Sequence, residues 1–188
     1  MSRSLRLIAL AILLSACNRE KLEPMTGTDA AKATAKVFNF QVYPGSTYLE
    51  PYTDLLKKAH FVLEPNAKAA PPMAVYETAD AVEKVAPWYA DKYGYATIAD
   101  TSSNNFSVVP PPAYYTEGDI QADLANFKPV LEKLSISTDV SKATGKYRGA
   151  YIKPQDTLPR VSIQRPYYDL INKKIVDRTL IVMVREGQ

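Results

Sequence analysis

The most constraining feature of this chain is a run of five apolar residues near its C-terminus, Leu180-Ile181-Val182-Met183-Val184. Successive side chains of a strand point to opposite faces of the sheet, so a strand of this composition is apolar on both faces. Strands of this kind are buried on both sides. The run therefore predicts a central strand, within residues 175–185, that is covered from above and below.

Alternation of polar and apolar residues predicts the other strands. Arg160–Gln164 alternates strictly, and we expect it to form a hairpin with the C-terminal strand through residues 169–174. Val37–Tyr43 also alternates, and Pro44-Gly45 ends it as a turn. Shorter strands are expected at Met73–Tyr76 and, as a pair across a polar turn, at Tyr95–Ala99 and Phe106–Val109.

The clearest helical pattern covers Asp80–Tyr93. Asp80 and Glu83 resemble a capping box, with Asp in place of Ser or Thr. Gly94 supplies a left-handed C-terminal stop, and Pro87 should kink or divide the helix. The apolar face consists of Val82, Val85, Ala86, Tyr89 and Tyr93.

Two more helices are predicted on either side of this one. Pro51 suits the first turn of the earlier helix, and the later one begins at Asp119. Pro129 interrupts the later pattern, so one helix and two short helices are both open. The apolar stripes are Leu55, Leu56 and Ala59 in the first, and Ile120, Leu124, Phe127, Leu131 and Leu134 in the second. Together these patterns predict a single α+β domain over residues 37–188, with a mostly antiparallel sheet and two or three short helices.

The N-terminus reads as a secretory signal peptide. Arg3 and Arg6 precede an apolar run, Leu7–Leu14, which is too short to span a bilayer. Leu14-Ser15-Ala16-Cys17 then resembles the lipobox of bacterial lipoproteins. That resemblance implies cleavage after residue 16, a diacylglycerol on the Cys17 thiol and acylation of the new amino group. Two or more acyl chains anchor a protein stably to a membrane.

The anchor has consequences for the mature chain. Cys17 is the only cysteine, so the lipidated protein has neither a free thiol nor a disulfide. Loss of Arg3 and Arg6 leaves 21 basic and 20 acidic residues, which gives no case for nucleic-acid binding. Residues 17–36 form a lipidated flexible tether, of about 25 Å on average. Asn18, in place of Asp, resembles the default for sorting to the periplasmic face of the outer membrane.

A second resemblance involves uncharacterised secreted bacterial proteins. In these a Tyr-Pro-Gly-Ala turn precedes a strand, and a helix ending Phe-Tyr-x-x-x-Leu comes before an aromatic strand. The matching segments here are Val42–Ser46, Val75–Asp80 and Val85–Tyr95, with Trp88 in place of Phe and Ser46 in place of Ala. Pro87 and the stretch from Tyr48 to Pro72 depart from the pattern. The resemblance implies a small α+β sandwich and carries no catalytic residues.

Few residues point to catalysis or metal binding. His60 is the only histidine, and a role in capping or packing is favoured over a catalytic one. Glu117, Asp119 and Asp123 could hold calcium, but the 12-residue calcium-loop pattern is missing and acids also favour a helix N-terminus. We therefore predict no catalytic residue, no metal site and no cofactor. A cleft gathering Asp119, Asp123, His60 and Arg165 would favour an enzyme instead.

Two functional hypotheses are open. In the first, the domain is a non-catalytic envelope lipoprotein that binds another envelope protein, as an accessory subunit of a membrane complex or in envelope assembly. Its interaction face would include Arg160, Arg165, Tyr167, Tyr168 and Arg178, since Arg and Tyr are enriched at interfaces. The alternative to such a face is a ladder of cross-strand ion pairs with Asp169 or Asp177. In the second hypothesis, a small ligand binds in a pocket lined by Trp88, Tyr89 and Tyr95.

The anchor can be tested directly. Changing Cys17 to Ala should abolish incorporation of labelled palmitate and leave the precursor uncleaved by the lipoprotein peptidase, because both steps require the thiol. Labelling and the size of the mature protein check this. Membrane retention without any label on the unaltered chain would contradict the lipobox assignment.

Overall fold

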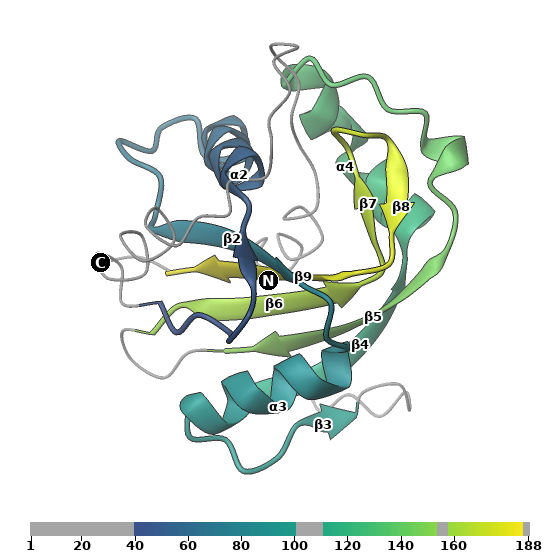
Figure 1. Cartoon of the computed structure of the whole chain (residues 1–188). Helices are drawn as coiled ribbons and strands as arrows, with labels where there is room; N and C mark the ends of the chain where they lie inside the picture. The colour runs from purple at the N-terminus through teal and green to yellow at the C-terminus, as the bar shows by residue number, and fades with distance from the viewer. Residues whose placement is uncertain (1–39, 101–110, 154–157, 186–188) are drawn as a thin grey trace.

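The C-terminal apolar run forms β9 (Thr179–Val184), an interior strand of a seven-stranded sheet. The structure is a computed structural model that describes residues 40–100, 111–153 and 158–185 (Figure 1). The strand order is β1-β2-β9-β6-β5-β4-β3, and β3–β4 is the one parallel pair in it. The other bounds are β1 Thr47–Tyr48, β2 Met73–Thr78, β3 Ala99–Asp100, β4 Ala113–Asp119, β5 Lys146–Ile152 and β6 Arg160–Arg165. The α+β class and the mostly antiparallel sheet are confirmed.

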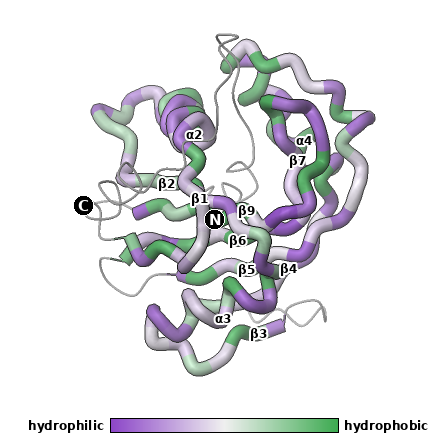
Figure 2. Tube along the Cα trace, viewed as in Figure 1, coloured by the Kyte–Doolittle hydropathy of each residue, from purple (hydrophilic) through white to green (hydrophobic). Residues whose placement is uncertain are grey.

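Helices cover both faces of this sheet, as the central strand requires. Leu180, Val182 and Val184 belong to a hydrophobic cluster with α2 (Glu50–Leu63) and α4 (Ile120–Lys133). Ile181 and Met183 belong to a second cluster with α3 (Val82–Lys92). Figure 1 shows α2 and α4 on one side of the sheet and α3 on the other. In Figure 2, hydrophobic residues recur along the central strands, whereas much of α2 that is in view is hydrophilic.

The start of α2 closes the β2 edge of the sheet. The Leu49 N–H donates to the Val75 carbonyl at 2.8 Å, and the Val75 N–H donates to the Thr53 hydroxyl at 3.0 Å. Pro51 lies in the first turn of α2, as predicted. These contacts satisfy backbone groups of β2 that the two-residue strand β1 does not reach.

The strand predicted at Val37–Tyr43 is wrong over the part that is described. Residues 40–43 form no strand, and Phe40 and Tyr43 both pack into the cluster under α3. The predicted turn does form: the Ser46 N–H donates to the Tyr43 carbonyl, and Gly45 has a φ of 74°. Phe40 and Tyr43 are three residues apart, so burial here follows an irregular path rather than strand alternation.

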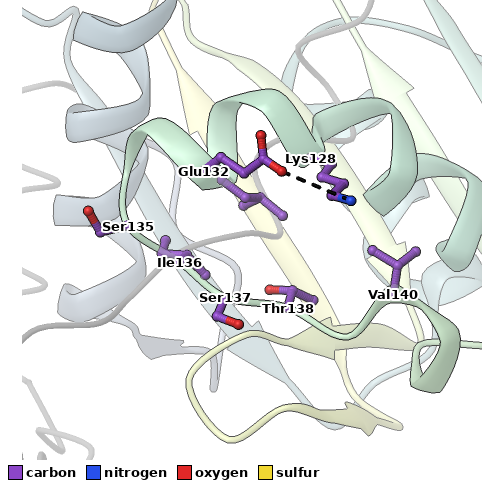
Figure 3. Close-up of a pocket in the computed structure, with 8 residues that line it drawn as sticks. Lys128, Glu132, Ser135, Ile136, Ser137, Thr138 and Val140 are labelled. Carbon is purple, nitrogen blue, oxygen red and sulfur yellow. Dashed lines mark ion pairs between the residues drawn. The ribbon is translucent and has the colours of Figure 1, made fainter.

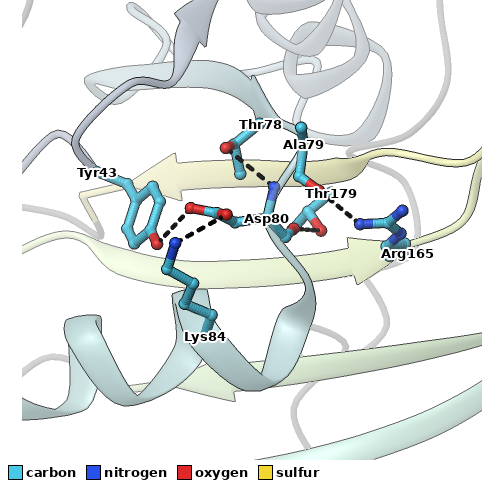
Figure 4. Close-up of polar contacts among 7 residues, drawn as sticks. All are labelled: Tyr43, Thr78, Ala79, Asp80, Lys84, Arg165 and Thr179. Atoms are coloured by element: carbon cyan, nitrogen blue, oxygen red, sulfur yellow. Dashed lines mark hydrogen bonds and ion pairs between the residues drawn. The ribbon is translucent and has the colours of Figure 1, made fainter.

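The helix predicted at Asp80–Tyr93 is α3, but the predicted capping box is wrong. Ala81 occupies the N-cap without a side-chain hydrogen bond. The Asp80 carboxylate instead accepts hydrogen bonds from the Tyr43 hydroxyl and from Lys84 (Figure 4). Gly94, with a φ of 76°, ends the helix as predicted, and Pro87 leaves it undivided.

The later helix is one helix, α4, because Pro129 does not divide it. Asp119 caps it by accepting the Ala122 N–H. The strand predicted at Tyr95–Ala99 is reduced to β3, which pairs with β4, and residues 106–109 lie outside the described residues. Strands β4 and β5 were not predicted.

The C-terminal hairpin is confirmed in part. β6 pairs with β9 in antiparallel register, as predicted. The connection between them forms a separate two-stranded sheet of β7 (Tyr167–Asp169) and β8 (Lys174–Val176).

No helix among the described residues is long and apolar enough to cross a membrane. The predicted signal peptide and tether lie outside those residues.

Substitution of Gly149 tests the packing of the central strands. A Cβ at this position would lie 2.8 Å from the Ile163 carbonyl oxygen of the neighbouring strand. Because backbone in a sheet interior cannot move freely, we expect Gly149→Ala to reduce the free energy of unfolding by about 1–3 kcal/mol. Urea unfolding of the full chain in detergent measures the change.

The control is Thr116, whose methyl carbon would lie 3.1 Å from the same Cβ. Adding Thr116→Ser should not restore stability, because the clash with the carbonyl oxygen remains. Full rescue by that second substitution would show that the carbonyl contact is not the cause.

Candidate functional site

The β7–β8 hairpin lies outside the main sheet and is held to it by buried tyrosines. A two-stranded hairpin alone is marginally stable in water, so it needs packing against the rest of the domain. Tyr167 and Tyr168 of β7 expose only 3% and 1% of their surface, and both belong to the cluster under α2 and α4. β7 is therefore the buried strand of the hairpin, and β8 is its outer strand.

Two tyrosine–carboxylate hydrogen bonds attach the hairpin to the rest of the domain. The Tyr52 hydroxyl of α2 donates to Asp169 Oδ1 at 2.5 Å. The Tyr167 hydroxyl donates to Glu77 Oε2 of β2 at 2.5 Å, and Arg178 Nε donates to Glu77 Oε1 at 2.6 Å. The hairpin is thereby joined to a helix and to the main sheet by separate charged contacts.

The electrostatics keep these donors protonated. Burial raises the pKa of Tyr52 far above its ordinary value, and the hydrogen bond to Asp169 raises it further. Burial and the hydrogen bond to Glu77 do the same to the pKa of Tyr167. Both effects disfavour the phenolate, so both hydroxyls remain hydrogen-bond donors throughout the physiological pH range.

The hairpin turn is also ordered by Asp169. Its carboxylate accepts the backbone N–H groups of Ile171 and Asn172 at 2.8 and 2.9 Å. The Asn172 side-chain amide donates to the same carboxylate at 2.6 Å. Lys173 then adopts a φ of 53°, the left-handed conformation that closes many hairpin loops.

The outer strand of the hairpin is exposed. β8 pairs with β7, and along its other edge it pairs with no strand of the described chain. Ile175 is 37% exposed, one of two large hydrophobic residues that are exposed among the described residues. Lys173 and Lys174 are exposed, and neither makes an ion pair within the described ranges. β8 thus presents an open edge with one apolar residue and two lysines that have no ion-pair partner among the described residues. The buried strand β7 holds this edge in place.

A cavity of about 350 Å³ lies at the C-terminal end of α4, near η3 (Val140–Lys142). Its apolar part includes Leu131 and Ile136, which are 1% and 5% exposed. The remaining lining residues are Lys128, Glu132, Ser135, Ser137, Thr138 and Val140 (Figure 3). The Thr138 hydroxyl oxygen is buried and has no hydrogen-bond partner in the part of the chain that the structure describes.

The hairpin lies beside the loop that borders this cavity. Tyr168 of β7 belongs to the same hydrophobic cluster as Leu131 and Ile136, which line the cavity. Val140 and Leu170 pack on the same hydrophobic cluster. The hairpin and the cavity therefore share one hydrophobic cluster.

The residues predicted as an interaction face do not form one surface. Tyr167, Tyr168 and Arg160 are buried. Arg178 joins Tyr167 at Glu77, as described above. Arg165 pairs with Asp177 at 2.8 Å, so the predicted ion pair across the hairpin forms. Arg165 also donates to the Ala79 carbonyl at 2.7 Å (Figure 4).

The residues predicted as an aromatic pocket take part in packing. Tyr89 is fully buried, and Trp88 contacts the rings of Tyr43 and Tyr89 at centroid distances of 5.4 and 4.8 Å. The Tyr95 hydroxyl donates to the Lys153 carbonyl. They lie around α3, on the opposite face of the sheet from the α4 cavity.

The candidate metal ligands have separate structural partners. Asp119 caps α4, and Glu117 pairs with Arg148 at 3.3 Å. Asp123 accepts a hydrogen bond from the Tyr147 hydroxyl; burial raises the pKa of Asp123, and this hydrogen bond opposes the rise. Over residues 40–100, 111–153 and 158–185, no group of three His, Cys, Asp or Glu residues could hold a metal ion. His60 lies in the last turn of α2 beside Phe61.

Sequence reasoning missed Tyr52, Glu77, Ile175 and the cavity. Tyr52 and Asp169 are 117 residues apart, and no local pattern signals such a contact. The segment containing the cavity reads as polar and irregular, so only the fold reveals its apolar floor.

Comparison with protein-family models, with curated proteins and with solved structures gave no match.

The anchoring of the hairpin can be tested with two Tyr→Phe changes. Tyr52→Phe removes a buried hydrogen bond to a carboxylate and should lower the free energy of unfolding by about 1–3 kcal/mol. Tyr95→Phe is the matched control, because its hydrogen bond is exposed, and we expect a loss below about 1 kcal/mol. Urea unfolding compares the two; equal losses would contradict the anchoring role of Tyr52.

Proposed function

We propose that this protein is a non-catalytic lipoprotein of the bacterial envelope that binds another envelope protein through the edge of β8. Acyl chains on Cys17 would hold it at the periplasmic face of the outer membrane. The observation that carries the proposal is the unpaired edge of β8 with exposed Ile175.

An open strand edge is a template for another strand. Its free N–H and C=O groups can pair with an extended segment of a second chain, which is a common mode of peptide recognition. The other described edges offer less. β1 and β3 are two residues long, the start of α2 covers β2, and all three residues of β7 are buried. β4 extends beyond β3 at Thr116–Asp119, but there Glu117 pairs with Arg148 and Asp119 caps α4. β8 is therefore the edge best suited to add a strand.

The attachment of β7 to the domain favours the binding of a partner at β8. Ordering a flexible segment on association costs free energy, and a segment that is already ordered avoids this cost. Tyr52, Tyr167 and Asp169 hold β7 and the turn in place through hydrogen bonds that are buried or partly buried. The strand that pairs with β8 is thus held in place by the rest of the domain.

The charges around β8 indicate what kind of segment would pair with it. Lys173 and Lys174 have no anionic partner in the described chain. Ile175, the next residue, is exposed and can make an apolar contact with a partner. Complementary charge favours specific partners and faster association. We infer that the partner contributes an extended segment containing an apolar residue and at least one Asp or Glu.

Site-specific photocrosslinking tests this interaction in cells. A photoreactive phenylalanine analogue at Ile175 should form an adduct of discrete size with one envelope protein. Phe61 of α2 is the matched control, because it is also large, apolar and exposed, at 43%, but lies on another element. We expect no equivalent adduct from Phe61.

Charge reversal completes the experiment. Lys173→Glu with Lys174→Glu should reduce the Ile175 adduct by about tenfold, because the acidic partner would then be repelled. Absence of an adduct at Ile175, the same adduct from both positions, or an adduct unaffected by charge reversal would each contradict the proposal. Unfolding curves of the variants establish that the domain remains folded.

A further inference from the structure

We propose that the outer face of α3, centred on Trp88, lies on the phospholipid headgroups of the membrane in which Cys17 is anchored. This inference rests on the lipid anchor of the proposed function and adds an orientation to it: α3 faces the membrane, and the edge of β8 faces away. The contacting surface consists of Trp88 and the charged side chains around it, which are Asp80, Lys84, Asp91 and Lys92.

The described chain begins on the α3 side of the sheet. Phe40, the first described residue, is buried in the hydrophobic cluster under α3, and so is Tyr43. The centroids of the Tyr43 and Trp88 rings are 5.4 Å apart, and the Tyr43 hydroxyl donates to Asp80 just before α3. The connection from Cys17 therefore enters the domain beside α3.

The expected length of this connection makes its point of entry important. The tether predicted for residues 17–36 averages about 25 Å. A folded domain of this length is about 40 Å across. Because the tether is shorter than the domain, the face at which the chain enters is held nearer to the membrane than the opposite face.

The proposed orientation leaves the edge of β8 accessible. Tyr167 and Tyr168 of β7 belong to the cluster under α2 and α4, on the other face of the sheet from α3. Figure 1 shows α3 at the bottom of the molecule and the β7–β8 hairpin at its upper right. With α3 on the membrane, a protein partner can approach β8 without meeting the bilayer.

Trp88 has the chemistry of a residue at a membrane–water interface. Tryptophan is enriched at such interfaces because its ring is apolar over most of its surface and carries one N–H donor. Trp88 is half-buried at the surface of α3, and contacts with the rings of Tyr43 and Tyr89 hold it in place. A side chain that is ordered before contact loses little conformational entropy on binding.

The charges around Trp88 match a headgroup layer that carries both signs. Lys84 and Lys92 lie about one turn before and after Trp88, and Lys92 Nζ is 5.7 Å from the centroid of the Trp88 ring. Asp80 pairs with Lys84 at 2.9 Å, and Asp91 precedes Lys92, so this face has no net charge.

Such a face suits zwitterionic phospholipids, which present a phosphate and an ammonium group. Lysine side chains can reach polar headgroups while their hydrocarbon stems cover apolar surface. Net charge does not attract this face to the membrane. The tether would instead keep the face there by raising its effective concentration near the bilayer.

Fluorescence tests the orientation directly, because Trp88 is the only tryptophan of the chain. The full acylated chain is reconstituted in phosphatidylcholine vesicles, with or without bromine near the glycerol ends of the acyl chains. Bromine quenches tryptophan only at short range, so the emission of Trp88 should be lower in the brominated vesicles. The quenching should persist in high salt, because the face has no net charge.

The matched control moves the single tryptophan to the other face of the sheet. In Trp88→Phe with Phe61→Trp, the tryptophan lies on α2, at a position where the native side chain is 43% exposed. Its emission should be equal in both kinds of vesicle, and unfolding curves establish that the variant folds. Equal emission from Trp88 in both kinds of vesicle, or the same quenching in the control, would overturn the proposed orientation.

Flotation of the same vesicles separates this inference from the lipid anchor on which it depends. A chain that floats with the vesicles while Trp88 stays unquenched contradicts the orientation alone. A chain that does not float contradicts the anchor, and the orientation with it. The Ile175 adduct should be unchanged in Trp88→Phe, so the edge of β8 is tested separately.

A crosslinking experiment in cells asks whether a protein covers this face instead. A photoreactive phenylalanine analogue in place of Trp88 should give no protein adduct of discrete size, because phospholipid surrounds the side chain. A discrete adduct with one envelope protein would assign the face to that protein and overturn the proposal.

Discussion

The architecture depends on the burial of β9 from both sides. Ile181 and Met183 are fully buried under α3, while Leu180, Val182 and Val184 are buried under α2 and α4. A strand that is apolar on both faces cannot lie at an edge or face water, so it needs paired strands beside it and helices above and below. β2 and β6 supply the pairing, and the three helices supply the two layers. The hairpin that carries the candidate interaction edge is a consequence of this arrangement, because the chain must leave β6 and return as β9.

This constraint also explains which parts of the fold could be predicted. The Leu180–Val184 run indicates a central strand without knowledge of its neighbours. The alternation at Arg160–Gln164 predicts a strand correctly, but it does not reveal that Ser162 and Gln164 are also buried, each 7% exposed. β4 and β5 were missed because glycines and polar residues interrupt their patterns. Gly118 has a local reason, since the ring of its register partner Tyr147 occupies the space of a Cβ.

Little of the candidate site could be predicted, for a different reason. The Tyr52–Asp169 and Tyr167–Glu77 contacts join residues 117 and 90 positions apart, and each residue taken alone has an ordinary local role. Tyrosine and arginine near the C-terminus did indicate a concentration of polar contacts. The fold then used Tyr167 and Arg178 to anchor the hairpin and left Ile175 exposed. Composition identified the region, and only the packing separated its buried residues from its exposed ones.

An exposed edge also creates a risk of self-association, and the hairpin limits it. β8 is three residues long, and short edge strands bearing lysine are a recognised way to prevent pairing between identical chains. Two copies meeting edge to edge would bring four lysines together at Lys173 and Lys174, which is unfavourable. An acidic segment meets no such repulsion. The same two charges therefore disfavour a second copy of this chain and favour a partner of opposite charge, so selectivity at this edge follows from electrostatics rather than from a large contact area.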